Sequence, residues 1–198
     1  MNTITTTLTT EAVFSDDGLQ RYLLRKSWKE TLPKLAIIML APSAASGIAL
    51  DNTTSLVLNN ADRLGYGSVA IVNLFATLND FALHHTEPQD HENLDAIVSV
   101  CQTADQIIYA PGTGKAKNKA FQQRQEQVLN ALRPFEAKLS CLCNADGKAR
   151  LQHPLSPAVK TWTLSPLAVS ELIENPKPAA PAPKKRSLPK VTKKECVA

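Results

Sequence analysis

The stretch Leu35-Ala36-Ile37-Ile38-Met39-Leu40-Ala41-Pro42-Ser43 decides the fold. Residues 35–40 form a continuous aliphatic run, which is typical of a strand buried on both faces of a parallel sheet. A second segment, His153-Pro154-Leu155-Ser156, also reads as a loop and lies near the end of the same region. Because loops at the carboxyl ends of parallel strands converge on the ligand crevice, we expect one site built from both ends of the domain.

Expected strands and helices alternate along the chain around this run. The predicted strands are residues 21–28, 35–40, 68–75, 106–110 and 138–143. One helix is predicted to begin at the cap residues 51–53 and to end by Gly65. Apolar residues at helical spacing predict two more, on Leu94, Ile97, Val98 and Cys101 and on Phe121, Val128, Leu129 and Leu132, and residues 167–173 form a short fourth. This order predicts an α/β fold, a three-layer sandwich with a mostly parallel central sheet.

Changes in composition divide the 198 residues into three parts. Residues 1–13 are Thr-rich and are expected to be a loose N-terminal lead-in, and residues 14–174 are expected to be a single α/β domain. Residues 175–198 are rich in Pro, Ala and Lys, which predicts a disordered basic tail. The net charge of +4 is concentrated in this tail, so the domain itself is close to neutral. The tail could contact the phosphates of nucleic acid or serve only to keep the protein soluble.

Several classes of protein are disfavoured by what the sequence lacks. It shows neither a signal-like apolar segment nor an apolar run of about 20 residues, so we expect a cytoplasmic location and no membrane partner. Four cysteines form no CxxC or zinc pattern and are expected to be small buried residues. The polar residues between 84 and 92, which include three histidines, are interpreted as a solvated loop. We therefore predict no metal and no cofactor.

Four residues are the predicted ligand contacts: Pro42, Ser43, Asn73 and His153. Asn73 falls near the end of a buried strand, where its amide would either hydrogen-bond a base edge or tie adjacent loops together. His153 would either donate to a ligand oxygen or fix the loop of Pro154. Pro42 and Ser43 would shape the floor of the crevice.

Three further residues are possible secondary contacts: Asp51, Asn52 and Gly112. Asp51 would either bind a polar ligand or cap the following helix, and capping is favoured, as it is for Ser43. Gly112 opens a segment with Gly114 and Lys115 that could hold a phosphate, but the spacing of a P-loop is absent. Ser156 is close to His153 in sequence, yet no nucleophile elbow surrounds it, so no catalytic residue is assigned.

Several ordered motifs resemble those of a bacterial and phage family, the domain of unknown function 1643. They are Arg21-Tyr22-Leu23-Leu24-Arg25-Lys26-Ser27-Trp28, Met39-Leu40-Ala41-Pro42-Ser43, Gly65-Tyr66-Gly67, Asn73-Leu74-Phe75, and Gly147 before His153-Pro154-Leu155. The resemblance covers roughly residues 14–165. It implies a fold but no activity, and Ala41 stands where that family usually has Asn.

The layout is also similar to that of uracil-DNA glycosylases. Their first strand ends in an Asp-Pro or Asn-Pro loop, a later strand ends in a base-reading Asn, and a late His-Pro-Ser loop supplies a His that stabilises the departing base. By position these features correspond to Ala41-Pro42, Asn73 and His153-Pro154. The alanine differs in chemistry, because its methyl group can neither accept a proton nor orient water.

Three functions follow from this reading, and whether the protein is an enzyme stays open. The first is binding of a nucleobase, nucleotide or nucleic acid in a glycosylase-like crevice. The second is hydrolysis of an N-glycosidic bond, with Asp51 or Asn52 positioning water. The third is a non-catalytic protein-interaction module of a mobile element, with an unknown protein partner.

Overall fold

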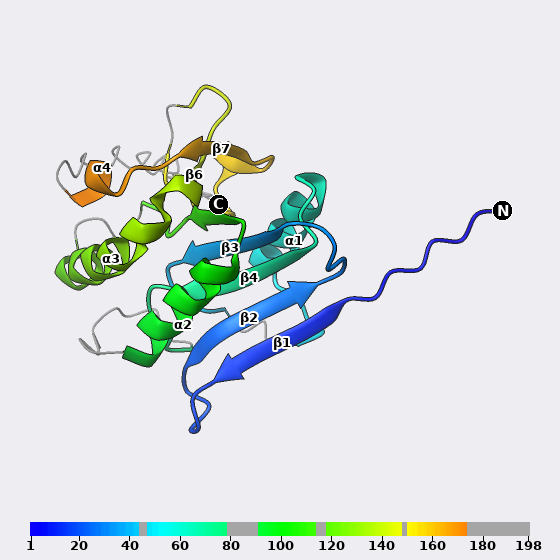
Figure 1. Ribbon diagram of the computed structural model, residues 1–198, viewed down its shortest axis with the longest axis horizontal. Coiled ribbons are helices and arrows are strands. Elements are labelled where there is room, and N and C mark those ends of the chain that lie inside the picture. The colour runs from blue at the N-terminus through cyan, green and yellow to red at the C-terminus, as the bar shows by residue number, and fades with distance from the viewer. Residues whose placement is uncertain (44–46, 79–90, 114–117, 148–149, 174–198) are drawn as a thin grey trace, which may run out of the picture.

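A computed structural model describes residues 1–43, 47–78, 91–113, 118–147 and 150–173. Seven strands form one sheet in the order β1-β2-β4-β3-β5-β6-β7, and helices flank it (Figure 1). The strands are β1 (Thr9–Phe14), β2 (Arg21–Ser27), β3 (Lys34–Met39), β4 (Ser68–Asn73), β5 (Gln106–Tyr109), β6 (Leu139–Cys143) and β7 (Thr163–Pro166). The α-helices are α1 (Asn52–Arg63), α2 (His91–Thr103), α3 (Lys119–Leu132) and α4 (Val169–Ile173), with short 3₁₀ helices at η1 (Arg133–Lys138) and η2 (Pro157–Val159).

The sheet is mixed, so the prediction of a mostly parallel sheet is wrong, whereas the α/β class is confirmed. In the described part of the chain, β4, β3, β5 and β6 are mutually parallel, and β1–β2, β2–β4 and β6–β7 are antiparallel pairs. The parallel strands are joined through helices, which leaves their carboxyl ends at one edge. The connections from β1 to β2, from β2 to β3 and from β6 to β7 contain no α-helix.

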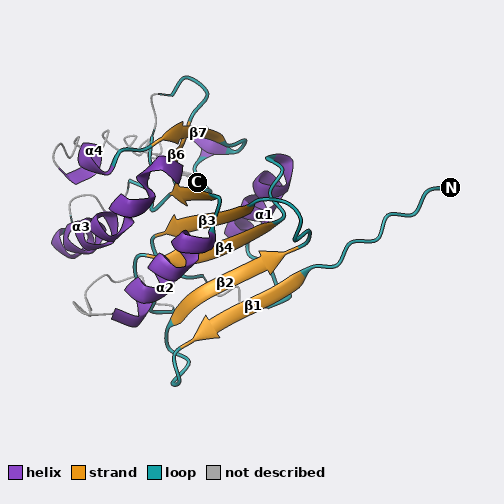
Figure 2. Cartoon of the chain, in the orientation of Figure 1, coloured by secondary structure: helices purple, strands orange, loops and turns teal. Residues whose placement is uncertain are grey.

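Helices lie on both faces of the sheet (Figure 2). Two apolar clusters, one on each face, hold the layers together. On one face, Ile38 and Val72 pack with α2 and α3, whose buried residues include Ile97 and Val128. On the other face, Ile37 and Ile71 pack with α1 through Val57. Successive residues of β3 alternate between the clusters, as expected for a strand covered on both sides.

The N-terminal boundary of the domain needs a correction. The predicted lead-in of residues 1–13 overlaps β1, which pairs with β2 along its length and forms one edge of the sheet. Its side chains are mostly exposed, so it carries no buried pattern that would predict a strand. The strand β7 was also missed, because it is short and half-exposed. The predicted tail lies outside the described residues, as does most of the polar segment with three histidines, whose last residues, His91 and Glu92, begin α2.

Local signals in the sequence agree with the observed ends of the helices. Asp51 caps α1 by accepting a hydrogen bond from the Thr54 amide at 2.6 Å. Asn118 caps α3 in the same way, accepting from the Phe121 amide at 3.1 Å.

Three cysteines, Cys101, Cys141 and Cys143, are buried thiols without a disulfide. Within the described ranges, no helix is long and apolar enough to cross a bilayer.

Candidate functional site

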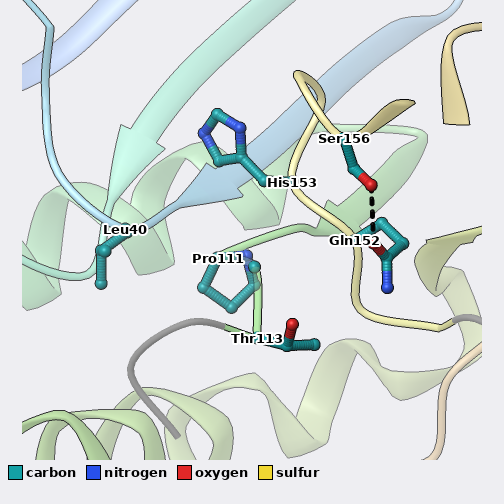
Figure 3. Close-up of a pocket in the computed structure, with 7 residues that line it drawn as sticks. Leu40, Pro111, Thr113, Gln152, His153 and Ser156 are labelled. Carbon is teal, nitrogen blue, oxygen red and sulfur yellow. Dashed lines mark hydrogen bonds between the residues drawn. The ribbon is translucent and has the colours of Figure 1, made fainter. Parts of the chain in front are cut away.

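A pocket opens at the carboxyl edge of the parallel strands, where loops from both ends of the domain meet. It has a volume of about 410 Å³ and is lined by Leu40 after β3, by Pro111, Gly112 and Thr113 after β5, and by Gln152, His153 and Ser156 after β6 (Figure 3). We call it the His153 pocket. Its position is where open α/β sheets bind ligands.

His153 is held in this pocket by its own turn. The Leu155 amide donates to Nδ1 at 3.2 Å, and the Ser156 amide donates to the His153 carbonyl at 2.8 Å. Because Nδ1 accepts, the neutral imidazole carries its proton on Nε2. Burial lowers the pKa of His153, and the nearby charge of Asp51 opposes that effect. The fixed turn leaves Nε2–H as the ring's donor at neutral pH.

Close packing of Gly112 against His153 determines how the two loops meet. Gly112 has φ +80°, and a Cβ built on it would lie 3.1 Å from the His153 Cβ. The left-handed backbone favours glycine there, and any larger residue would also press against the Cβ of His153. Gln152 and Ser156 instead bind each other, since the Ser156 hydroxyl donates to Gln152 Oε1 at 2.8 Å (Figure 3). Their pairing supports the loop.

The loop between β3 and α1 contributes a group of charged and polar side chains. The Asp51 carboxylate accepts a hydrogen bond from the Thr54 amide at 2.6 Å, and the Ser43 side chain contributes to lowering the pKa of Asp51. Partial burial alone would raise the pKa of Asp51, but these hydrogen bonds and the Arg21 charge together lower it. Arg21 is buried, and its Nη1 donates to the Ser43 carbonyl at 3.1 Å. The carboxylate of Asp51 therefore stays ionised at neutral pH.

Asn73 is the last residue of β4 and is only 1% exposed, yet its side-chain Oδ1 and Nδ2 have no hydrogen-bond partner among the described residues. It lies two residues after Ile71, so its side chain points to the α1 face. The loop-tying role considered for Asn73 belongs to Asn93 of α2, whose Nδ2 donates to the carbonyls of Asn73 and Leu74 at 3.1 and 3.2 Å. Asn73 is not among the residues that line the His153 pocket.

The sequence reading missed Arg21, because a β-bulge decides which way this side chain points. Val13 pairs with Leu23 but Phe14 pairs with Arg21, so Tyr22 is an extra residue in β2. With strict alternation, Arg21 would share the face of Leu23, which packs toward α2. The bulge moves Arg21 to the face of the β3–α1 loop instead. Tyr22 points the other way and donates to Glu92 of α2 at 2.6 Å.

Comparison with family models gives a match over residues 21–155 to a family described as a protein of unknown function, DUF1643. The matched segment covers more than half of the chain. The chain belongs to the DUF1643 family. Searches of the curated proteins and of the solved structures returned no match.

The DUF1643 match begins at β2 and ends in the turn of His153, so it leaves out β1 and β7 at the two edges of the sheet. It includes Arg21, Ser43, Asp51, Asn73 and His153. The remaining predicted contacts lie in the same segment but differ in exposure. Pro42 is buried, and Asn52 is exposed as the first residue of α1. Ala41 is half-buried and offers no polar group to the site.

Asp51 should stabilise this DUF1643 protein in a pH-dependent way. Asp51→Ala removes the cap of α1, and we expect a loss of about 1 kcal/mol in the free energy of unfolding at pH 7. Because the folded-state pKa is depressed, the charge-dependent part is present above the unfolded pKa and is lost as pH falls through the folded pKa. Urea unfolding between pH 2 and pH 7 checks both statements. Asp51→Asn, which can still cap, should lose only the pH-dependent part, and an equal loss in both variants would contradict this.

Proposed function

We propose that this protein binds a nucleobase-containing ligand, as a base, a nucleotide or part of a nucleic acid, at the carboxyl edge of β3, β4 and β5. The observation that carries this proposal is the buried amide of Asn73, without a partner among the described residues. A buried polar group left unpaired costs about 1–3 kcal/mol, so a buried amide without a partner at the end of β4 calls for an explanation.

The chemistry of an amide suits the edge of a base. Asn73 offers an acceptor at Oδ1 and two donors at Nδ2, and each base edge presents donors and acceptors side by side. His153 adds a donor at Nε2 from the pocket that the late loop forms. Both groups are neutral at pH 7, which favours the uncharged heterocycle over a phosphate as the part of the ligand that they contact.

The similarity of layout to uracil-DNA glycosylases supports the same proposal. In that arrangement an Asn at a strand end and a His in a late loop face one base. The His153 pocket has a volume of about 410 Å³, within the usual range for small-molecule sites. Pro42 is buried at the end of the first central strand and Ser43 is held by Arg21, so this loop would form a rigid floor.

Binding should depend on the two polar side chains together. We expect the full-length protein to bind at least one member of a panel of bases, nucleosides, mononucleotides and labelled single-stranded oligonucleotides, measured by calorimetry or fluorescence anisotropy. Asn73→Ala with His153→Ala should lower the affinity by at least tenfold, because two charge-neutral hydrogen bonds are lost. Gln123→Ala is the matched control, since it changes an exposed side chain of α3 that does not line the pocket.

The tail should be separable from the crevice in the same assay. Any binding through residues 175–198 would fall with salt and would persist in the double variant. Unchanged affinity of a folded double variant at moderate salt would sink the proposal of a base-binding crevice.

Hydrolysis of an N-glycosidic bond is a second candidate, favoured by the ionised Asp51 carboxylate near His153. Asp51 would replace the water-positioning group that Ala41 cannot provide. Base release from nucleosides or damaged DNA, followed by chromatography, is expected to disappear in both Asp51→Asn and His153→Ala. Ligand binding with no release from any substrate would leave binding alone as the function.

A further inference from the structure

We infer that Ser156 is a specificity-determining residue of the His153 pocket, where it accepts a hydrogen bond from the ligand while His153 donates one. The pocket then selects a neutral ring that carries both an N–H donor and a carbonyl or ring-nitrogen acceptor. This inference deepens the proposed function and rests on it for the presence of a base-like ligand. Both side chains line the same pocket (Figure 3).

The orientation of the Gln152 amide determines what the Ser156 hydroxyl can do. Gln152 Nε2 donates to the Arg150 carbonyl at 3.1 Å, and that carbonyl carries no proton and can only accept. The amide oxygen Oε1 therefore faces the Ser156 hydroxyl, which donates to it at 2.8 Å. Because the one proton of the hydroxyl is used in this bond, Ser156 Oγ offers only lone pairs to a ligand.

His153 has the opposite hydrogen-bonding character. Its Nδ1 accepts from the Leu155 amide at 3.2 Å, so the neutral ring carries its proton on Nε2 and can only donate there. Within the described ranges, no other group bonds to His153 Nε2 or donates to Ser156 Oγ. The pocket wall therefore presents one donor and one acceptor whose roles are set by the protein itself.

The backbone holds these two groups in place without a ligand. Leu151 has φ +57°, a left-handed conformation that is costly for a residue with a Cβ. Its side chain packs against the apolar cluster of α2 and α3, and the Gln152 amide donates to the Leu142 carbonyl of β6 at 3.3 Å. The Ser156 amide closes the turn on the His153 carbonyl at 2.8 Å. A strained backbone that packing and hydrogen bonds maintain is typical of ligand sites.

The remaining wall of the pocket suits an uncharged ring. Leu40 and Pro111 are apolar, and in the view of Figure 3 Pro111 lies between Leu40 and the Gln152–Ser156 pair. The described lining residues include neither lysine nor arginine. An anion such as sulfate or a phosphodiester has acceptor oxygens only, so it would face the lone pairs of Ser156 Oγ without a cation to offset the repulsion.

The test compares rings that differ in their N–H groups. Uracil and hypoxanthine are each titrated into the full-length protein beside the analogue that is methylated at every N–H nitrogen, and the amide signals of Gly112, His153 and Ser156 are followed by NMR. We expect at least one parent ring to bind about five- to tenfold more tightly than its methylated analogue, the effect of one hydrogen bond. Sulfate should leave the Ser156 amide signal unchanged.

Variants separate hydrogen bonding from the bulk of the added methyl groups. Ser156→Ala removes the acceptor, so it should weaken binding of the parent ring by about five- to tenfold and leave binding of the methylated ring unchanged. Ser156→Thr keeps the hydroxyl and should keep the preference. Gln152→Met keeps the length of the side chain but frees the Ser156 proton to donate, so the preference should shrink. Gln123→Ala, on the exposed surface of α3, is the matched control and should change neither affinity.

The outcomes distinguish this inference from the proposed function. If rings bind but the parent and methylated forms bind equally, or if the preference survives in Ser156→Ala, the inference is overturned and the base-binding proposal stands. An unchanged preference in Gln152→Met would overturn the role of Gln152. A His153 ring with its proton on Nδ1, read from its nitrogen shifts without ligand, would also overturn the inference. If no ring binds at all, the proposed function fails and this inference fails with it.

Discussion

Asn73→Leu is expected to make the protein more stable and to remove ligand binding. Leucine has the same branching and the same number of side-chain heavy atoms as asparagine and would occupy the same buried position beside Ile71 on the α1 face. The substitution replaces a buried amide, which lacks hydrogen bonds in the described structure, by an apolar group. We expect a gain of about 1–3 kcal/mol in the free energy of unfolding, measured by urea denaturation.

The same variant should lose ligand binding, because a residue that is kept although it lowers stability is typical of a functional site. Asn93→Leu is the matched control. Its Nδ2 donates to the carbonyls of Asn73 and Leu74, so the same substitution there should destabilise the fold. A destabilised Asn73→Leu variant would mean that Asn73 has a structural partner and would remove the main support for a ligand at this position.

Gly67→Ala is expected to be strongly destabilising, by more than about 3 kcal/mol. A Cβ built on Gly67 would lie 1.8 Å from the Lys29 carbonyl oxygen and 2.8 Å from the Leu32 Cβ. The first of these atoms belongs to the backbone and is tied in place, because the amides of Trp28 and Lys29 both donate to the Gly67 carbonyl. The chain cannot move away without breaking the join between β2, β3 and β4.

Gly65→Ala is the matched control two residues earlier. Gly65 has φ +84° but nothing within 4 Å of a built Cβ, so only the left-handed backbone is penalised. We expect it to cost about 1–2 kcal/mol. Thermal or urea unfolding of the two variants should therefore differ clearly, and equal costs would contradict the close approach at Gly67.

The sequence predicted the central part of the fold because the signals there are local. The aliphatic run that became β3 has no polar residue to mark a solvent face, and that pattern specifies burial on both sides. Asp51 could be predicted as a cap because its side chain bonds an amide only three residues away. The convergence of the first and last loops followed from the rule for parallel strands, and Leu40 and His153 do line one pocket.

Strand direction at the two edges was not predictable in the same way. The strands β2 and β4 carry similar buried patterns, and these patterns do not show whether the two strands pair in a parallel or an antiparallel direction. The edge strand β1 buries so little side-chain surface that its composition does not predict its pairing with β2. The expectation of a mostly parallel sheet failed for this reason.

The sequence likewise predicted some features of the candidate site and missed others. The sequence by itself determined that Asn73 stands at the end of a buried strand and that His153 stands in a late loop beside Pro154. Only the tertiary structure decided that Arg21 supports the β3–α1 loop, because one extra residue in β2 reverses the face of its side chain. It also decided that Asn93, and not Asn73, ties the strand end to α2. Contacts between residues this far apart depend on strand register, and register is fixed only when the whole sheet packs.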